Sequence, residues 1–314
     1  MSEIEVSMLC CTHNHEKFVR DAINGMLNQK VPFKYEILIR DDASTDGTVE
    51  ILKEYEAKYP DIIKVYCETE NQRSIGVRRC FHILMRRAKG KYIALCDGDD
   101  YWIDPKKIIN QYDYMEEHDD CQMVVTDAVR YNESTGGFEE HFYTKGVPCD
   151  YRLKDIAPVQ RPASTSTFFF RNGQKEPDWY FRTIIGDTPL LLLRTYRGYL
   201  HYMPKTTTVY RIGTGTSNMD ERTKHSPEQK ILNNMEFIWM YDLLNKETKY
   251  ECDKEFGQRI SDLLYGTGLL AVNNGIKVPK IVYQRLKLSK RIKMHIREWF
   301  KMKKQMSADS KPLS

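Results

Sequence analysis

The chain has 314 residues, of which 41% are hydrophobic and 29% charged, and its formal net charge is +4. This is the composition of a soluble globular protein, and the length predicts one large domain with an appendage or two modest domains. The first six residues lack the basic and apolar segments of a secretory signal, and no apolar run approaches the ~18 residues that span a bilayer. Of the eight cysteines, Cys10, Cys11 and Cys96 fall in apolar runs. Scattered cysteines of this kind favour reduced thiols in a cytoplasmic protein over a disulfide framework or a zinc site.

The first hundred residues alternate strand and helix patterns. Strands are predicted at residues 6–11, 35–40, 62–67 and 92–96. Helices are predicted at 16–29 and 76–88, and a further helix runs through Tyr59 and is stopped by Pro60. Repeated βα units of this spacing predict a mostly parallel sheet with right-handed crossovers.

The second half is less regular. Strands are predicted at 122–126 and 165–171, with a hairpin around Gly136 and Gly137 between them. From Ser226, a capping residue followed by Pro227, only helical patterns occur, as far as about Lys304.

An acidic cluster follows the fourth predicted strand: Asp97-Gly98-Asp99-Asp100. Open α/β sheets bind their ligands at the carboxyl ends of strands, and oxygen ligands without nearby His or Cys favour Mg²⁺ or Mn²⁺. The alternative is a solvated acidic turn that caps the helix beginning near Pro105.

Five segments form an ordered set that resembles the family 2 glycosyltransferases, which are inverting enzymes of the GT-A fold. The resemblance covers roughly residues 5–217, and its motifs are Val6–Glu16, Glu36–Thr48, Gly76–Arg79, Asp97–Asp100 and Ile185–Leu190, followed by Val209–Arg211.

The resemblance implies roles for individual residues. Asp99 would bind the divalent ion, Mn²⁺ or Mg²⁺, that bridges the donor diphosphate, and Asp187 would be the catalytic base that takes the acceptor proton. Trp102 is a candidate for stacking on a sugar, and Arg211 for contact with the acceptor or sugar. The residues assigned to nucleotide-sugar binding are Cys11, Thr12, His13, Asn14, Glu16, Asp42, Arg79, Asp97 and Gly98.

The sequence departs from the family pattern at several positions. Cys11 and His13 replace the usual Pro and Tyr, Gly186 replaces a Glu before the base, and Gly213 stands where the family often has a His that joins the metal or diphosphate site. His13 and His15 flank Asn14, but no carboxylate lies at metal-ligand spacing, so a histidine-based metal site is not expected.

Other interpretations of the same residues stay open. Asp42, with Ser44 and Asp46, is placed to cap the following helix, and Asp187 to cap a helix over 189–196. The alternative for Arg79 is that its side chain belongs to a solvated helix face.

Residues 277–304 contain eleven Lys or Arg and one acid, Glu298, a net charge of +10 against −6 for the rest of the chain. Apolar residues recur near helical spacing in this segment and include Trp299 and Phe300. Such a helix either lies on an anionic membrane surface or packs its stripe on the protein. Nucleic-acid binding is not expected, because no recognised module accompanies the charge.

We therefore expect an α/β GT-A domain at 1–220, with a nucleotide-sugar half at 1–101 and an acceptor half at 102–220. A helical region at 221–306 and a tail at 307–314 would follow. The expected function is transfer of one sugar, most simply from a UDP-sugar, to a saccharide or lipid-linked oligosaccharide at the inner face of a membrane. The processivity motif Gln-x-x-Arg-Trp is absent, so single additions are predicted. The alternatives are a sugar nucleotidyltransferase and a catalytically silent saccharide-binding scaffold on the same fold.

Overall fold

The computed structural model describes residues 3–72, 80–141, 149–158, 163–183, 185–216 and 223–294. The chain divides into two compact units, residues 1–221 and 222–314, each taken by itself below. Among the described residues, no helix is long and apolar enough to cross a membrane.

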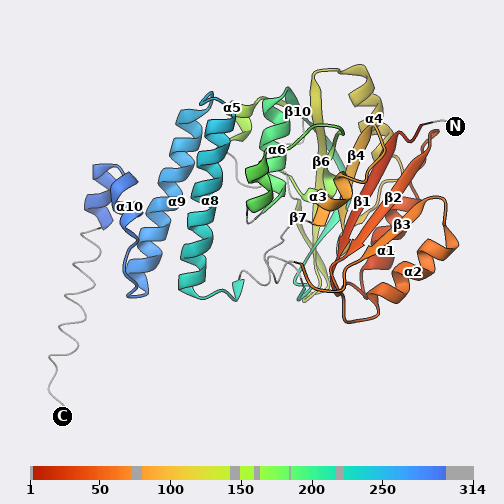
Figure 1. The fold of residues 1–314 in the computed structure, drawn as a ribbon, viewed down its shortest axis with the longest axis horizontal. Coiled ribbons are helices and arrows are strands. Elements are labelled where there is room, and N and C mark those ends of the chain that lie inside the picture. Colours follow the sequence, from red (N-terminus) through yellow and green to blue (C-terminus); the bar gives the residue numbers. More distant parts are fainter. Residues whose placement is uncertain are drawn as a thin grey trace, which may run out of the picture. The chain divides into compact units, whose positions relative to one another are not determined.

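The first unit is built on a ten-stranded sheet of order β3-β2-β1-β4-β9-β6-β10-β5, with β7 paired to β6 and β8 to β10 (Figure 1). Its strands are β1 Val6–Thr12, β2 Tyr35–Asp41, β3 Ile63–Cys67, β4 Tyr92–Asp97, β5 Tyr101–Trp102, β6 Cys121–Asn132, β7 Gly137–His141, β8 Cys149–Tyr151, β9 Phe169–Arg171 and β10 Tyr199–Ile212. Its helices and 3-10 turns are α1 Val19–Leu27, α2 Thr48–Lys58, α3 Cys80–Met85, α4 Lys107–Glu117, α5 Leu153–Ile156, η1 Thr165–Thr167, η2 Asp178–Arg182 and α6 Asp187–Tyr196.

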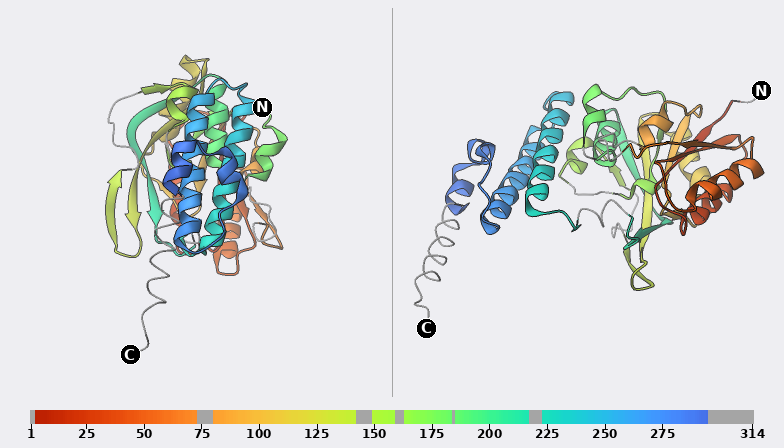
Figure 2. Two further views of the ribbon diagram at one scale, coloured as in Figure 1. Left: turned by 90° about the vertical axis from the view of Figure 1, so that its left-hand side faces the viewer. Right: turned by 60° about the horizontal axis from the view of Figure 1, so that its bottom comes forward.

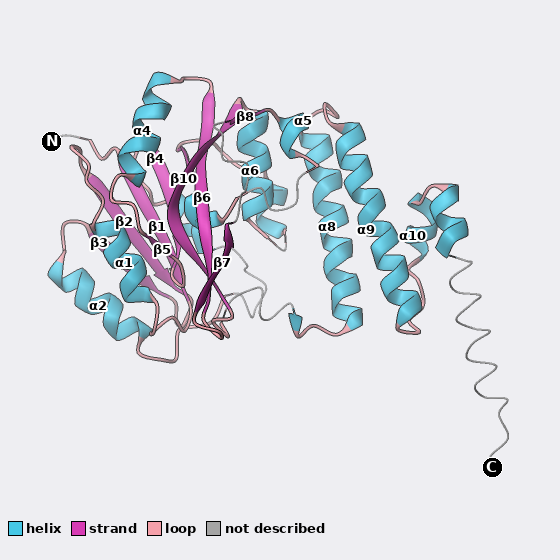
Figure 3. Cartoon of the chain, turned by 180° about the vertical axis from the view of Figure 1, so that it is seen from behind, coloured by secondary structure: helices cyan, strands magenta, loops and turns pink. Residues whose placement is uncertain are grey.

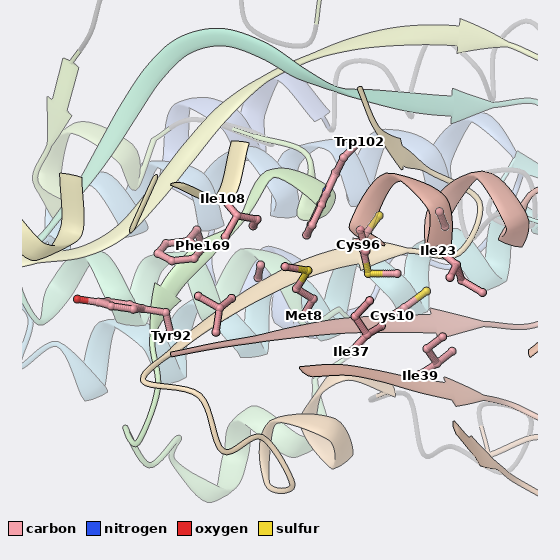
Figure 4. Close-up of a cluster of buried hydrophobic side chains, with 14 of the residues drawn as sticks. Met8, Cys10, Ile23, Ile37, Ile39, Tyr92, Cys96, Trp102, Ile108 and Phe169 are labelled. Carbon is pink, nitrogen blue, oxygen red and sulfur yellow. The ribbon is translucent and has the colours of Figure 1, made fainter. Parts of the chain in front are cut away.

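The four predicted N-terminal strands are confirmed, and β1 pairs in parallel with both β2 and β4. Their apolar side chains form one buried cluster with residues of α1 and α4, including Met8, Cys10, Ile23 and Ile108 (Figure 4). Buried parallel strands read as continuous apolar runs, which is why the sequence located them well.

The second half of the sheet corrects the sequence interpretation. The predicted strand 165–171 is a 3-10 turn, η1, followed by the short β9, which runs antiparallel to both β4 and β6. The longest strand, β10, was not predicted; it runs beside β6 (Figure 3) with register shifts between Met203 and Thr208. The predicted hairpin is confirmed by the pairing of Asn132 with Gly137.

The second unit contains α8 Pro227–Glu247, α9 Asp253–Asn273 and α10 Lys280–Arg285. The two long helices pack against each other, and α10 packs on α9 (Figure 2). The predicted start of α8 is confirmed, because the Ser226 hydroxyl accepts a hydrogen bond from the Gln229 amide at 3.3 Å.

The predicted basic helix is described only in its first part; residues 295–304, with Trp299 and Phe300, and the tail 307–314 lie outside the described residues. In the described part the helix is not continuous, because α10 ends at Arg285 and Leu286 is extended. Two basic residues form ion pairs inside the unit, Arg285 with Asp242 at 2.6 Å and Lys290 with Asp262 at 2.7 Å. Leu288 and Ile292 are exposed.

Candidate active site

The site is organised by the carboxyl ends of β1, β2 and β4, which end level with one another. Thr12 is in register with Asp41, and Cys11 with Asp97. The Thr12 hydroxyl donates to the Asp41 carboxylate at 2.8 Å, and the Gly98 amide donates to the Cys11 carbonyl at 2.9 Å. The loops that follow the three strands are therefore joined where they leave the sheet.

The loops after β1 and β2 are also tied to each other. The Asn14 amide donates to the Ser44 hydroxyl at 2.8 Å, and the Asn14 side-chain oxygen accepts the Thr45 amide at 2.8 Å. Asn14 and Ala43 have φ values of 55° and 57°, the left-handed region, where Asn carries less strain than most residues. The two hydrogen bonds of Asn14 therefore fix its neighbours, His13 and His15.

The helix-cap interpretation is wrong for Ser44 and Asp42 and right for Asp46. Ser44 bonds the Asp41 carboxylate through its hydroxyl at 2.5 Å and its amide at 2.8 Å. The Thr48 amide at the start of α2 donates instead to Asp46 at 3.0 Å. Glu16 supports the same turn by accepting the Gly47 amide at 3.2 Å, so Glu16 braces a loop.

His13 and Asp42, both assigned to a nucleobase pocket, lie together. The His13 Nδ1 is 2.9 Å from the Asp42 carbonyl oxygen, and the Asn71 side-chain amide is 3.3 Å from the same oxygen. One Asp42 carboxylate oxygen accepts the Gln72 amide at 2.9 Å, with Arg40 at 3.4 Å. The buried Arg40 guanidinium supplies the positive charge that a nearly buried carboxylate needs.

The acidic cluster separates into carboxylates with different surroundings. Asp100 is structural, since its two oxygens accept the Ser166 hydroxyl at 2.6 Å and the Arg211 amide at 3.0 Å. The same Ser166 oxygen accepts the Asp97 amide at 3.0 Å. Ser166, which η1 places under the loop, was not identified from sequence, because nothing near it in the chain indicates this contact.

Asp97 and Asp187 are brought near each other although they are 90 positions apart. Burial raises the pKa of the Asp97 carboxyl well above its usual range, and the charges of Asp99 and then Asp187 raise it further. The N-cap residue of α6 is Gly186, which has no side chain to cap the helix. The Asp187 carboxylate, at the first position of α6, accepts the Thr188 amide at 2.7 Å. Asp187 thus supports the first turn of its helix, and its charge acts on Asp97.

Gly98 is required by close packing. A Cβ at this position would lie 2.5 Å from the Thr12 methyl carbon, 2.8 Å from His15 Nδ1 and 2.9 Å from the Cys11 carbonyl oxygen. Only glycine lets the acidic loop approach the loop after β1 this closely.

Arg211 does not present its guanidinium to a sugar, which corrects the sequence-based role. Its Nε donates to Glu133 at 2.7 Å, its Nη1 to the Asp99 carbonyl at 3.0 Å and its Nη2 to Asp21 at 2.6 Å. The guanidinium also stacks on Tyr101, 4.4 Å from the ring centre. Arg211 therefore holds the acidic loop in place.

Trp102 is corrected in the same way. Its side chain is 4% exposed, its indole N–H donates to the Ser166 carbonyl at 2.7 Å, and its ring lies in the core cluster (Figure 4). A ring in this position is not free to stack on a sugar.

Two assigned residues need separate mention. Arg79 lies outside the described residues. Cys11 is disulfide-bonded, whereas Cys10 and Cys96 are free and buried, so the expectation of reduced thiols is wrong for Cys11. The Cys11 backbone still lines the site through its bond to Gly98.

The donor set suits a hard divalent ion. No group of three or more His, Cys, Asp or Glu side chains able to hold an ion alone is found in the described part of the chain. Mg²⁺ and Mn²⁺ commonly bind through one or two carboxylates plus substrate phosphates, so Asp99 with a diphosphate is a sufficient set. Burial, and after it the charges of the neighbouring acids, raise the pKa of the Asp97 and Asp100 carboxyls, and a cation here would offset both effects.

A mostly parallel sheet with an acidic loop at its carboxyl edge, extended by antiparallel strands, is the architecture of GT-A glycosyltransferases. The sequence profile of Glycosyl transferase family 2 matches residues 7–179, more than half of the chain, and the chain belongs to this family.

Individual relatives agree with this assignment. An uncharacterized protein of Mycobacterium tuberculosis is 31% identical over 206 residues, which are 66% of this chain and 58% of the relative. The Escherichia coli protein WfaP, named UDP-Glc:alpha-D-GlcNAc-diphosphoundecaprenol beta-1,3-glucosyltransferase, is 32% identical over 143 residues, 45% of this chain and 50% of WfaP. The chain thus spans little more than half the length of these relatives.

Among solved structures, residues 1–349 of S. aureus TarS in complex with UDP-GlcNAc align with a TM-score of 0.57. The alignment covers 94% of this chain and 87% of the TarS chain at 18% identity. At this identity the likeness shows a shared fold.

Proposed function

We propose that this protein transfers a single sugar from a nucleoside diphosphate sugar, most simply a UDP-sugar, to a saccharide hydroxyl with inversion. The observation that carries the proposal is that Asp97 and Asp99 follow β4 at the carboxyl edge of the sheet, and that the charge of Asp187, at the start of α6, acts on Asp97.

Asp99 is the proposed ligand of a divalent ion, which when bound supplies Lewis-acid stabilisation of the departing diphosphate. The chain's own contribution is to fix that carboxylate. Arg211 holds the Asp99 carbonyl, and Ser166 and Arg211 hold Asp100 next to it. A preorganised ligand costs no rearrangement as charge develops on the leaving group.

Asp187 is the proposed general base. A sugar hydroxyl is a poor nucleophile near neutral pH, and a carboxylate that takes its proton during attack contributes typically ~10²–10⁴-fold. Asp97, between Asp187 and the ion site, would hydrogen-bond donor sugar or ribose hydroxyls. With the base and leaving group on opposite faces of the sugar, one displacement inverts the anomeric carbon.

The nucleobase would lie between His13 and Asp42. The imidazole offers a face for stacking, and the Asp42 carboxylate would accept a base N–H. WfaP by name uses UDP-glucose, which supports a uridine nucleotide here.

A lipid-linked saccharide is the proposed acceptor, with the enzyme held at the cytoplasmic face of a membrane by residues 277–304. WfaP is named for such an acceptor, and the basic segment has apolar Leu288 and Ile292 exposed beside it. Arg285, Lys290 and Arg291 are bonded within the unit. The residues proposed to meet the lipid are the exposed Lys277, Lys280, Lys287 and Lys293.

The rival functions differ in what they require. A sugar nucleotidyltransferase would have a glycine-rich phosphate loop after β1, where this chain has Cys11-Thr12-His13-Asn14. A silent scaffold would bind saccharide and hydrolyse no nucleotide sugar.

The test is calorimetric titration of UDP and GDP, each with and without Mn²⁺, into wild type and Asp99→Ala. We expect UDP binding that depends on Mn²⁺ and is lost in the variant. Tight binding of GDP alone would overturn the uridine assignment. Binding of neither nucleotide would overturn the proposal that the protein is a glycosyltransferase. Asp113→Ala, on α4, is the matched control and should bind as wild type does.

A further inference from the structure

His15 is held rigidly beside the acidic loop. Its amide donates to the Thr48 hydroxyl at 2.9 Å, and its carbonyl accepts the amides of Phe18 and Val19 at the start of α1 at 2.9 and 2.8 Å. The residue is 8% exposed. Its position is therefore set by the fold and not by the contacts of its ring.

The imidazole has no hydrogen bond within the described part of the chain. Its Nδ1 is buried without a partner, and its Nε2 lies 4.0 Å from an Asp99 carboxylate oxygen. The Nδ1 atom lies against Gly98, where a Cβ would be only 2.8 Å away, so Nε2 is the ring nitrogen on the side of Asp99.

The separation of His15 and Asp99 is too long for a hydrogen bond and suits two ligands of one ion. With metal–ligand bonds of about 2.1 Å, two ligands lie about 3.0 Å apart when adjacent and about 4.2 Å when opposite. The 4.0 Å between Nε2 and the carboxylate oxygen falls in this interval. Gly98 makes the approach possible, since a Cβ there would lie 2.8 Å from the ring.

We propose that His15 is a second protein ligand of the divalent ion held by Asp99, binding through Nε2. The proposal rests on the proposed function, which supplies the ion and the diphosphate. The sequence indicated no histidine site because His15 and Asp99 are 84 positions apart.

An imidazole ligand has a consequence for ion preference. Mg²⁺ prefers oxygen ligands and strict octahedral geometry, whereas first-row transition ions accept nitrogen more readily. Replacing His15 should therefore weaken binding of Mn²⁺ more than binding of Mg²⁺.

Electron spin-echo envelope modulation of the Mn²⁺–UDP complex tests the ligand directly, because a coordinated imidazole gives a nitrogen modulation that oxygen ligands do not. We expect this modulation in wild type, its loss in His15→Ala, and a fall of about tenfold or more in Mn²⁺ affinity. His118→Ala is the matched control; its ring stacks on Tyr114, at the end of α4, and it should keep the modulation.

Nitrogen modulation that is absent from wild type, or kept in His15→Ala, overturns the proposal. So does a His15→Ala protein with wild-type Mn²⁺ affinity. If wild type forms no Mn²⁺–UDP complex at all, the proposed function itself fails, which is a different result from a complex that forms without nitrogen modulation.

Discussion

The two units of the chain use charged residues in opposite ways. In the first unit, Arg40, Lys107 and Arg194 are fully buried and Arg211 nearly so. In the second, Arg285 and Asp242 pair at the surface with side chains 33% and 39% exposed. The residue types are the same in both cases, and what differs is whether the side chains are buried or exposed.

The comparison teaches where charge carries function. A buried guanidinium must be fully bonded to be tolerated, so it also fixes its partners in space. The Arg211 guanidinium fixes the Asp99 carbonyl in this way, and the Arg40 guanidinium lies against Asp42. Surface pairs leave their partners free to exchange with water and contribute little.

The largest effect is expected at Asp187, the proposed general base. Asp187→Asn keeps the bond to the Thr188 amide but removes the base. We expect kcat for sugar transfer to fall by ~10²–10⁴-fold with UDP affinity unchanged. Asp178→Asn, an exposed residue of η2, is the matched control. An unchanged kcat would remove Asp187 from the mechanism.

The next largest effect is expected at Arg211, the residue that joins the buried network to the acidic loop. Arg211→Met leaves Asp21, Glu133 and the Asp99 carbonyl without their donor. The Asp21 and Glu133 side chains are 53% and 27% exposed and can be hydrated, so the loss should cost about 2 kcal/mol of unfolding free energy. Mn²⁺–UDP affinity should fall with it.

Arg211→Lys separates positioning from stability. A lysine restores the charge, but its donors sit on one nitrogen and cannot reach acceptors that are spread around the three nitrogens of the guanidinium. It should regain part of the unfolding free energy and little of the Mn²⁺–UDP affinity, measured by denaturation and by calorimetry. If the unfolding free energy and the Mn²⁺–UDP affinity recover together, Arg211 stabilises the fold and has no separate positioning role.

A third test concerns Lys107, which is wholly buried with its ammonium 4.4 Å from the Trp102 ring centre and bonded to Gln111 at 2.7 Å. Burial lowers the pKa of Lys107 to about 7, from 10.5. Between pH 7 and 10 the unfolded chain therefore holds a proton that the folded chain does not, and stability rises with pH through this window.

Lys107→Met should remove that contribution. The difference in unfolding free energy between wild type and variant should change by up to about 1.4 kcal/mol per pH unit between pH 7.5 and 9.5. Lys230→Met, in the second unit and able to donate to the Thr223 carbonyl at 3.4 Å, should show no such slope. Parallel curves for wild type and Lys107→Met would mean that Lys107 is charged when buried.

The N-terminal half of the fold could be predicted because each of its strands is an apolar run bounded by turn residues. The strand β10 could not, because His201, Pro204 and Lys205 interrupt its pattern and its pairing with β6 is irregular. The run Thr165–Phe170 reads as a strand, but its first three residues turn so that Ser166 can reach the acidic loop.

The site was predictable only where its motifs are local. The acidic loop and Asp187 follow from short motifs, and the resemblance supplied their roles. The contacts that set these residues in place join Asp21 to Arg211 over 190 positions and His15 to Asp99 over 84. No spacing rule reaches so far, so Arg211 was assigned to a sugar and His15 to no site.

The smallest effect is expected at Arg285, where the comparison between the units is sharpest. Its guanidinium bonds both Asp242 oxygens at 2.6 Å, a geometry as good as any in the first unit. Because both side chains are about a third exposed, water replaces most of what the pair provides. Arg285→Ala should therefore cost less than about 1 kcal/mol, and the coupling in a double-mutant cycle with Asp242→Ala should weaken as salt is raised. A coupling above about 2 kcal/mol that is insensitive to salt would show that the pair behaves as a buried one, and that hydrogen-bond geometry outweighs exposure in this protein.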